Sequence, residues 1–147
     1  MRIAVLAVLL LVTACGARPG AGQHCTAIGA PAGIAIEVAP PVASMTSLTL
    51  DVCWNGSCHA YPVPLAASTT PAEQTCTGAM CAVPLRQTGG RHGFADIPDL
   101  PTIPVEVTVS GHTADVTPRL QYPNGPDCGA GGAQAGLVLD ETGLRAR

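Results

Sequence analysis

Cysteine and histidine are the residues of this sequence best suited to chemistry. Deprotonated thiols and imidazoles bind zinc or copper, paired thiols form disulfides, and a thiol or hydroxyl beside an imidazole can act as a nucleophile. The seven cysteines are at positions 15, 25, 53, 58, 76, 81 and 128, and the four histidines are at positions 24, 59, 92 and 112. The spacing of these residues decides among the three kinds of chemistry.

Nucleophilic catalysis finds little support in the sequence. Ser57, Cys58 and His59 are adjacent, but consecutive residues of a strand point to opposite faces. The sequence contains no GxSxG motif, and the other histidines stand in unrelated contexts. We therefore predict that the protein is not an enzyme.

A metal site is the next alternative, with Met45 or Met80 as a possible soft ligand for copper. The cysteines occur in two CxxxxC pairs rather than in the CxxC spacing of zinc ribbons. An exported protein would also have its thiols oxidised. We predict no metal and no cofactor.

The first fifteen residues have the anatomy of an export signal. A short positive start is followed by the apolar run Ile3–Val12 and then by the small residues Thr13 and Ala14. The junction Val12–Gly16 resembles the bacterial lipobox, whose cysteine receives a diacylglyceryl group. The resemblance implies a signal peptide over residues 1–14 and acyl chains such as palmitate on Cys15. The alternative is an ordinary secretory signal.

The parity of the cysteines agrees with this interpretation. If Cys15 carries lipid, six cysteines remain, and six can pair completely in an oxidising compartment. The sequence favours the pairs Cys53–Cys58, Cys76–Cys81 and Cys25–Cys128, although six cysteines allow fifteen connectivities. Residues 15–24 are expected to form a lipidated, flexible tether before a single domain at 25–147.

Alternating apolar residues predict short strands over most of that domain. Asn55-Gly56 separates two of them and predicts a tight hairpin that brings Cys53 opposite Cys58. Residues 66–75 and 89–93 are expected to be loops. The strands are expected at residues 33–38, 46–54, 57–65, 82–86, 104–110, 113–117, 119–122, 136–140 and 144–147.

These short strands, with no helical periodicity, predict an all-β fold. The expected architecture is an antiparallel β-sandwich of immunoglobulin-like or similar topology, stapled by disulfides.

The chain resembles small secreted lipoproteins of high-GC actinobacteria. The resemblance rests on three segments: Cys25–Ile34, Val52–Cys58 and Tyr122–Cys128. It implies a cell-membrane location at the extracytoplasmic face and a disulfide-rich domain, but it brings no activity with it.

Charge and composition restrict the possible partners. Removing the signal leaves six arginines against ten acidic residues, a net charge of −4, which argues against nucleic acid. Trp54 and Tyr61 are weak candidates for a binding surface, because Trp54 shares a face with core-like leucines. We expect a non-catalytic binding or structural module of the cell envelope that uses its loops. The alternative is a carrier or sensor of a small extracytoplasmic ligand.

Overall fold

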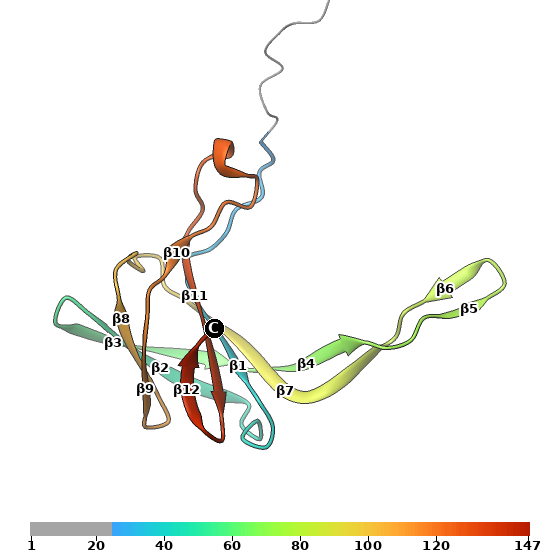
Figure 1. Cartoon of the computed structure of the whole chain (residues 1–147), viewed down its shortest axis with the longest axis horizontal. Coiled ribbons are helices and arrows are strands. Elements are labelled where there is room, and N and C mark those ends of the chain that lie inside the picture. Colours follow the sequence, from blue (N-terminus) through green and yellow to red (C-terminus); the bar gives the residue numbers. More distant parts are fainter. Residues whose placement is uncertain (1–24) are drawn as a thin grey trace, which may run out of the picture.

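The computed structural model describes residues 25–147. The predicted signal peptide, the predicted lipidation of Cys15 and the predicted tether at 15–24 lie outside the described residues. Within the described range the chain is all-β, with two sheets packed face to face and a projecting two-stranded ribbon (Figure 1). The predicted sandwich fold is therefore confirmed.

The larger sheet, sheet A, has the strand order β10-β11-β1-β7-β4, and β12 also pairs with β11. Its strands are β1 (Gly33–Val38), β4 (Ala66–Pro71), β7 (Leu85–Asp96), β10 (Arg119–Leu120), β11 (Ala133–Asp140) and β12 (Gly143–Ala146). All neighbours are antiparallel except β1 and β11, which run parallel over six residue pairs.

The second sheet, sheet B, has the order β3-β2-β8-β9 and is antiparallel throughout. Its strands are β2 (Ser47–Trp54), β3 (Ser57–Pro64), β8 (Val105–Val109) and β9 (His112–Val116). The β2–β3 turn is the predicted one, since Asn55 and Gly56 have φ values of 51° and 77°.

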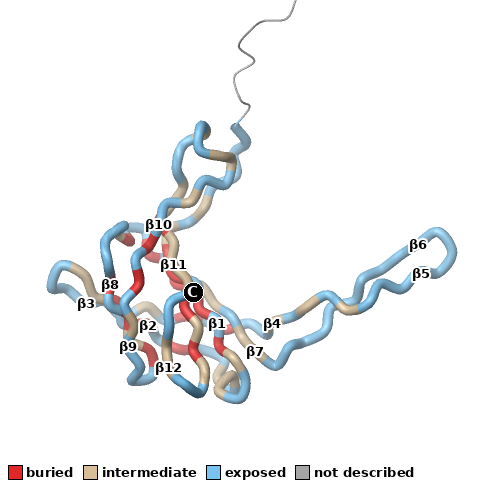
Figure 2. Tube along the Cα trace, viewed as in Figure 1, coloured by how far each residue is buried: buried red, intermediate tan, exposed pale blue. Residues whose placement is uncertain are grey.

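Period-2 alternation explains how these strands make a core. Every second residue of β1, β2 and β8 faces the core, and the residues between them face away from it. The fully buried side chains between the sheets are aliphatic, among them Ile34, Ile36, Leu50, Val107 and Leu137. Figure 2 shows the buried residues confined to the body of the sandwich.

The N-terminal segment of the described chain and the connection between β10 and β11 meet in a narrow stem above the body (Figure 1). We define the stem as residues 25–32 and 120–132, which include the one-turn 3-10 helix η2 (Pro126–Cys128). The Cys25–Cys128 disulfide joins its two segments. Hydrogen bonds such as Gly132 N to Ala30 O (2.8 Å) continue the pairing towards the sandwich.

Two expected loops are strands instead. Residues 66–71 form β4, and residues 89–93 lie inside the twelve-residue strand β7. β4 has a Ser/Thr/Pro/Ala sequence with no alternating pattern, so its conformation is fixed by pairing with β7. The glycines at 89 and 90 belong to a bulge within that pairing.

Two further strands, β5 (Thr75–Thr77) and β6 (Met80–Ala82), form a separate two-stranded sheet at the end of the ribbon. The chain between β4 and β7 therefore extends well away from the sandwich (Figure 1). No helix among residues 25–147 is long and apolar enough to cross a membrane.

Candidate functional site

The projecting ribbon is the most unusual surface of the domain. We call residues 69–87 the arm; it contains the second half of β4, the strands β5 and β6, and the beginning of β7. No residue from 66 to 94 is buried, although the flanking Leu65 and Ala95 belong to the core. Figure 2 shows the arm exposed along its whole length.

A wide bulge directs the arm away from the sandwich. Ala67 pairs with Arg91 and Thr69 pairs with Gln87, so Ser68 opposes three residues of β7, Thr88 to Gly90. Such extra residues bend the strand and increase its twist. Gly89 has a φ of 82°, a backbone conformation that suits glycine and disfavours residues with a Cβ.

Hydrogen bonds fix the geometry of this bend. Thr88 Oγ1 donates to Ser68 O at 3.2 Å, and Gly90 N donates to Thr88 Oγ1 at 3.3 Å. Arg91 Nε donates to Ala43 O at 3.0 Å, which ties the base of the arm to the loop that precedes β2. The arm therefore leaves the body from a defined base.

A disulfide braces the far end of the arm. Cys76 pairs with Cys81 across the β5–β6 ladder, and Gly78 completes the turn with a φ of 63°. Since the arm has no buried residue, the ladder and this disulfide replace a hydrophobic core as its sources of order.

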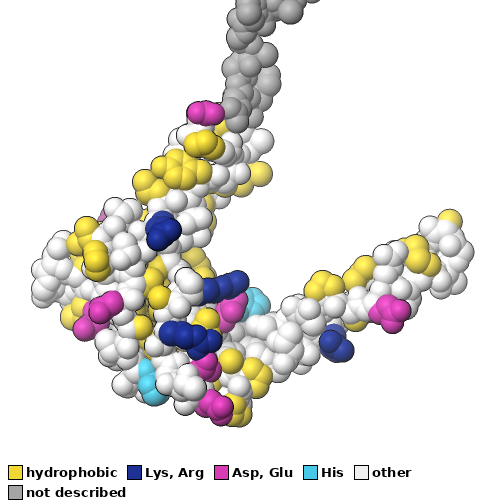
Figure 3. Space-filling model, viewed as in Figure 1, with side chains coloured by type: hydrophobic (Ala, Val, Ile, Leu, Met, Phe, Trp, Pro, Cys, Tyr) yellow, Lys and Arg dark blue, Asp and Glu magenta, His cyan; other side chains and the backbone are white. Residues whose placement is uncertain are grey.

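Apolar side chains are exposed along the arm. Met80 is 79% exposed and Leu85 is 69% exposed, and Val83 lies between them in sequence. Leu85 is directly opposite Pro71 in the ladder, which places the two side chains on one face. Figure 3 shows hydrophobic side chains over much of the length of the arm. Exposed apolar side chains that gather in one region mark an interaction site in many soluble proteins.

The long edges of the arm are poorly suited to pairing with another strand. Among residues 25–147, β4 is an edge strand and β7 pairs with β1 only from Arg91 onward, so both edges lack ladder partners there. Pro71 and Pro84 have no backbone N–H to donate. The apolar side chains therefore offer more to a partner than the backbone does.

The aromatic residues singled out from the sequence lie elsewhere. Trp54 and Tyr61 are partly buried against the core, and the Trp54 ring lies 5.7 Å from the His59 ring, centroid to centroid. They are on β2 and β3, outside the arm. Their role as a binding surface stays a prediction.

The six cysteines within the described residues form the three expected pairs, Cys25–Cys128, Cys53–Cys58 and Cys76–Cys81. The His59 ring lies on the face of β3 that packs near Trp54, while Cys58 is in its disulfide. No cluster of three metal-ligating side chains is found within the described part of the chain.

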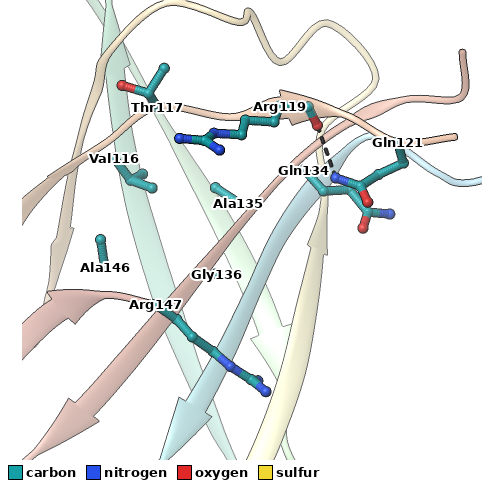
Figure 4. Close-up of a pocket in the computed structure, with 9 residues that line it drawn as sticks. All are labelled: Val116, Thr117, Arg119, Gln121, Gln134, Ala135, Gly136, Ala146 and Arg147. Carbon is teal, nitrogen blue, oxygen red and sulfur yellow. Dashed lines mark hydrogen bonds between the residues drawn. The ribbon is translucent and has the colours of Figure 1, made fainter. Parts of the chain in front are cut away.

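An open hollow of about 720 Å³ lies where sheet A is interrupted between β10 and β12 (Figure 4). Gln121 Nε2 donates to Arg119 O at 3.0 Å on its rim. The Arg119 and Arg147 guanidinium groups point in different directions, and Arg147 pairs with Glu37. The polar lining residues are Thr117, Arg119, Gln121, Gln134 and Arg147.

The sequence carried only one signal for the arm, the second CxxxxC pair at residues 76 and 81. Nothing in the sequence indicated that Met80, Val83 and Leu85 are exposed, because hydrophobic residues beside prolines also occur in cores.

No protein-family model matches the chain, and neither a curated protein nor a solved structure is significantly similar to it.

Proposed function

We propose that this protein is a lipid-anchored, non-catalytic module of the cell envelope that binds a protein partner through the arm. The observation that carries the proposal is the set of exposed apolar side chains on the arm, which is a disulfide-braced hairpin without a core. Ordering such a hairpin in advance lowers the entropy lost on binding.

The composition of the arm favours protein over other partners. It has no aromatic residue on which a sugar ring could stack. Its charged residues are Glu73 and Arg86, so it has no net charge with which to attract nucleic acid. Exposed Leu, Val and Met side chains match the apolar centre of a protein interface.

Site-specific photocrosslinking in intact cells tests the arm. A benzoylphenylalanine at position 83 is expected to crosslink to one defined protein, whereas the same group at exposed Thr49 on sheet B is not. The substitution Leu85→Asp should abolish the adduct at position 83, and Thr49→Asp should leave it unchanged. Equal crosslinking from both positions, or an adduct insensitive to Leu85→Asp, would contradict the proposal.

The anchor is tested by the mass of the protein isolated from native membranes. We expect a mature chain that begins at Cys15 and carries diacylglyceryl, with no thiol available for alkylation. An unmodified Cys15 would refute the membrane attachment. Binding of a partner by the arm would still be tested by the crosslinking experiment.

A second candidate function is binding of a small anion in the hollow beside β11. The observation that favours it is the Arg119 guanidinium in the lining, which has no carboxylate partner among the described residues, whereas Arg147 pairs with Glu37. A panel of small carboxylates and phosphates should raise the melting temperature, and Arg119→Gln should remove the effect. A panel without any shift would eliminate this candidate.

A further inference from the structure

Exposed hydrophobic side chains gather at a second place, the stem. Ile28 is 63% exposed, Tyr122 is 47% exposed and Leu120 is 45% exposed. Together with the three residues of the arm they account for six of the seven large hydrophobic residues that the described chain exposes, the seventh being Ile103. The stem is a narrow projection with little room for a core of its own (Figure 1).

Hydrogen bonds and a disulfide hold together the two segments of the stem that carry these three residues. Asn124 Nδ2 donates to Ile28 O at 2.7 Å, and Gly125 N donates to Tyr122 O at 3.0 Å. The Cys25–Cys128 disulfide closes the end beyond them. These contacts hold Ile28 and Tyr122 on neighbouring segments, and Figure 3 shows hydrophobic side chains along the stem.

The short separation in sequence between Cys25 and the proposed anchor at Cys15 indicates which part of the domain faces the membrane. Cys25 is ten residues after Cys15 in the sequence. Ten residues span at most about 35 Å when fully extended. Because Cys25 lies at the far end of the stem, the stem is the part of the described domain that the lipid holds closest to the bilayer (Figure 1).

The chemistry of the stem suits the lipid–water interface. Tyrosine prefers the headgroup level, where its ring is apolar on one side and its hydroxyl is hydrated. Asp127 is the only charged residue of the stem, so little charge must be desolvated. A covalently tethered surface also meets the bilayer at a high effective concentration, and weak apolar contacts are then sufficient.

We propose that the stem rests on the outer surface of the lipid bilayer through Ile28, Leu120 and Tyr122. The contact rests on the proposed lipidation of Cys15. This contact would orient the domain relative to the bilayer, which a flexible tether alone would not do. It would also hold the arm at a fixed height and direction above the membrane.

The test uses the full chain purified from native membranes and reconstituted into vesicles of phosphatidylethanolamine and phosphatidylglycerol. Trp54→Phe provides a background without tryptophan, into which Tyr122→Trp places a probe on the stem. Glu141→Trp is the matched control, since it lies in the β11–β12 turn at the opposite end of the body. A third variant, Ile28→Trp, repeats the measurement if Tyr122→Trp fails to fold.

Vesicles with brominated acyl chains are expected to quench the tryptophan at position 122 or 28 and to leave the tryptophan at 141 unchanged. Flotation of the vesicles is measured on the same samples. Protein that floats with unquenched tryptophan at 122 and 28 would overturn the stem contact while leaving the anchor intact. Protein that does not float would refute the anchor, and the stem contact would fall with it.

Discussion

The body of the sandwich and the arm are made from the same kind of short strand, but they obtain their order in different ways. In the body, alternate side chains of β1, β2 and β8 are buried between two sheets. In the arm, no side chain is buried, and the bulge at Thr88–Gly90, a backbone ladder and a disulfide fix the conformation. The residues that stabilise the fold and the exposed apolar residues of the arm are therefore separate sets.

The largest expected difference concerns the disulfides. Cys25 and Cys128 are 103 residues apart, whereas Cys76 and Cys81 are five apart. The chain-entropy model gives about 4 to 5 kcal/mol for the first and about 2 kcal/mol for the second. The second value applies to local opening of the arm, which has no buried residue, and not to unfolding of the body. We expect the Cys25→Ala/Cys128→Ala variant to lose several kcal/mol in urea unfolding, because its loop encloses every strand of the body except β11 and β12.

The Cys76→Ala/Cys81→Ala variant should instead unfold at the same urea concentration as the unmodified protein, and only its arm should become sensitive to protease. This follows from a loop that lies entirely within the arm. A clear loss of global stability in this variant would show that arm and body unfold as one unit.

Truncation of one leucine in each region gives the next largest contrast. Leu50 is fully buried, and Leu50→Ala should cost about 2 to 5 kcal/mol through lost burial and the cavity left behind. Leu85→Ala should change the free energy of unfolding by no more than about 0.5 kcal/mol, as for other surface substitutions. The measurement is equilibrium urea unfolding of both variants; similar losses would mean that the arm packs against something in solution.

The smallest expected effect is a pH dependence that arises in the body alone. The Thr142 hydroxyl, which donates to Asp140 at 2.5 Å, lowers the pKa of Asp140 to about 2, assisted by Arg145 and by the Thr142 backbone N–H. The unfolded carboxyl has a pKa of about 3.9. Its stabilising contribution is therefore complete above about pH 4 and is lost as the pH falls towards 2.

Asp140→Asn should flatten the stability profile between about pH 2 and 4, and Thr142→Val should flatten it in part by removing the largest cause of the shift. Unfolding measured by circular dichroism across that range checks both. A profile that is unchanged in Asp140→Asn would contradict the assignment.

Local pattern in the sequence determined much of the body. Alternating Val, Ile and Leu predicted β1, β2 and β8, and Asn55-Gly56 predicted the turn that pairs Cys53 with Cys58. These features depend on neighbours along the chain, so the residues themselves specify them. The Cys76–Cys81 brace of the arm was predictable for the same reason.

Only the tertiary structure decided the rest. Residues 66–71 become a strand because β7 is beside them, and β1 lies parallel to β11 across about a hundred residues of sequence. Exposure of Met80, Val83 and Leu85 follows from the bulge at Thr88–Gly90, which carries the ribbon away from the second sheet. A hydrophobic residue has the same identity in a core and on a surface, and its burial depends on which distant elements cover it.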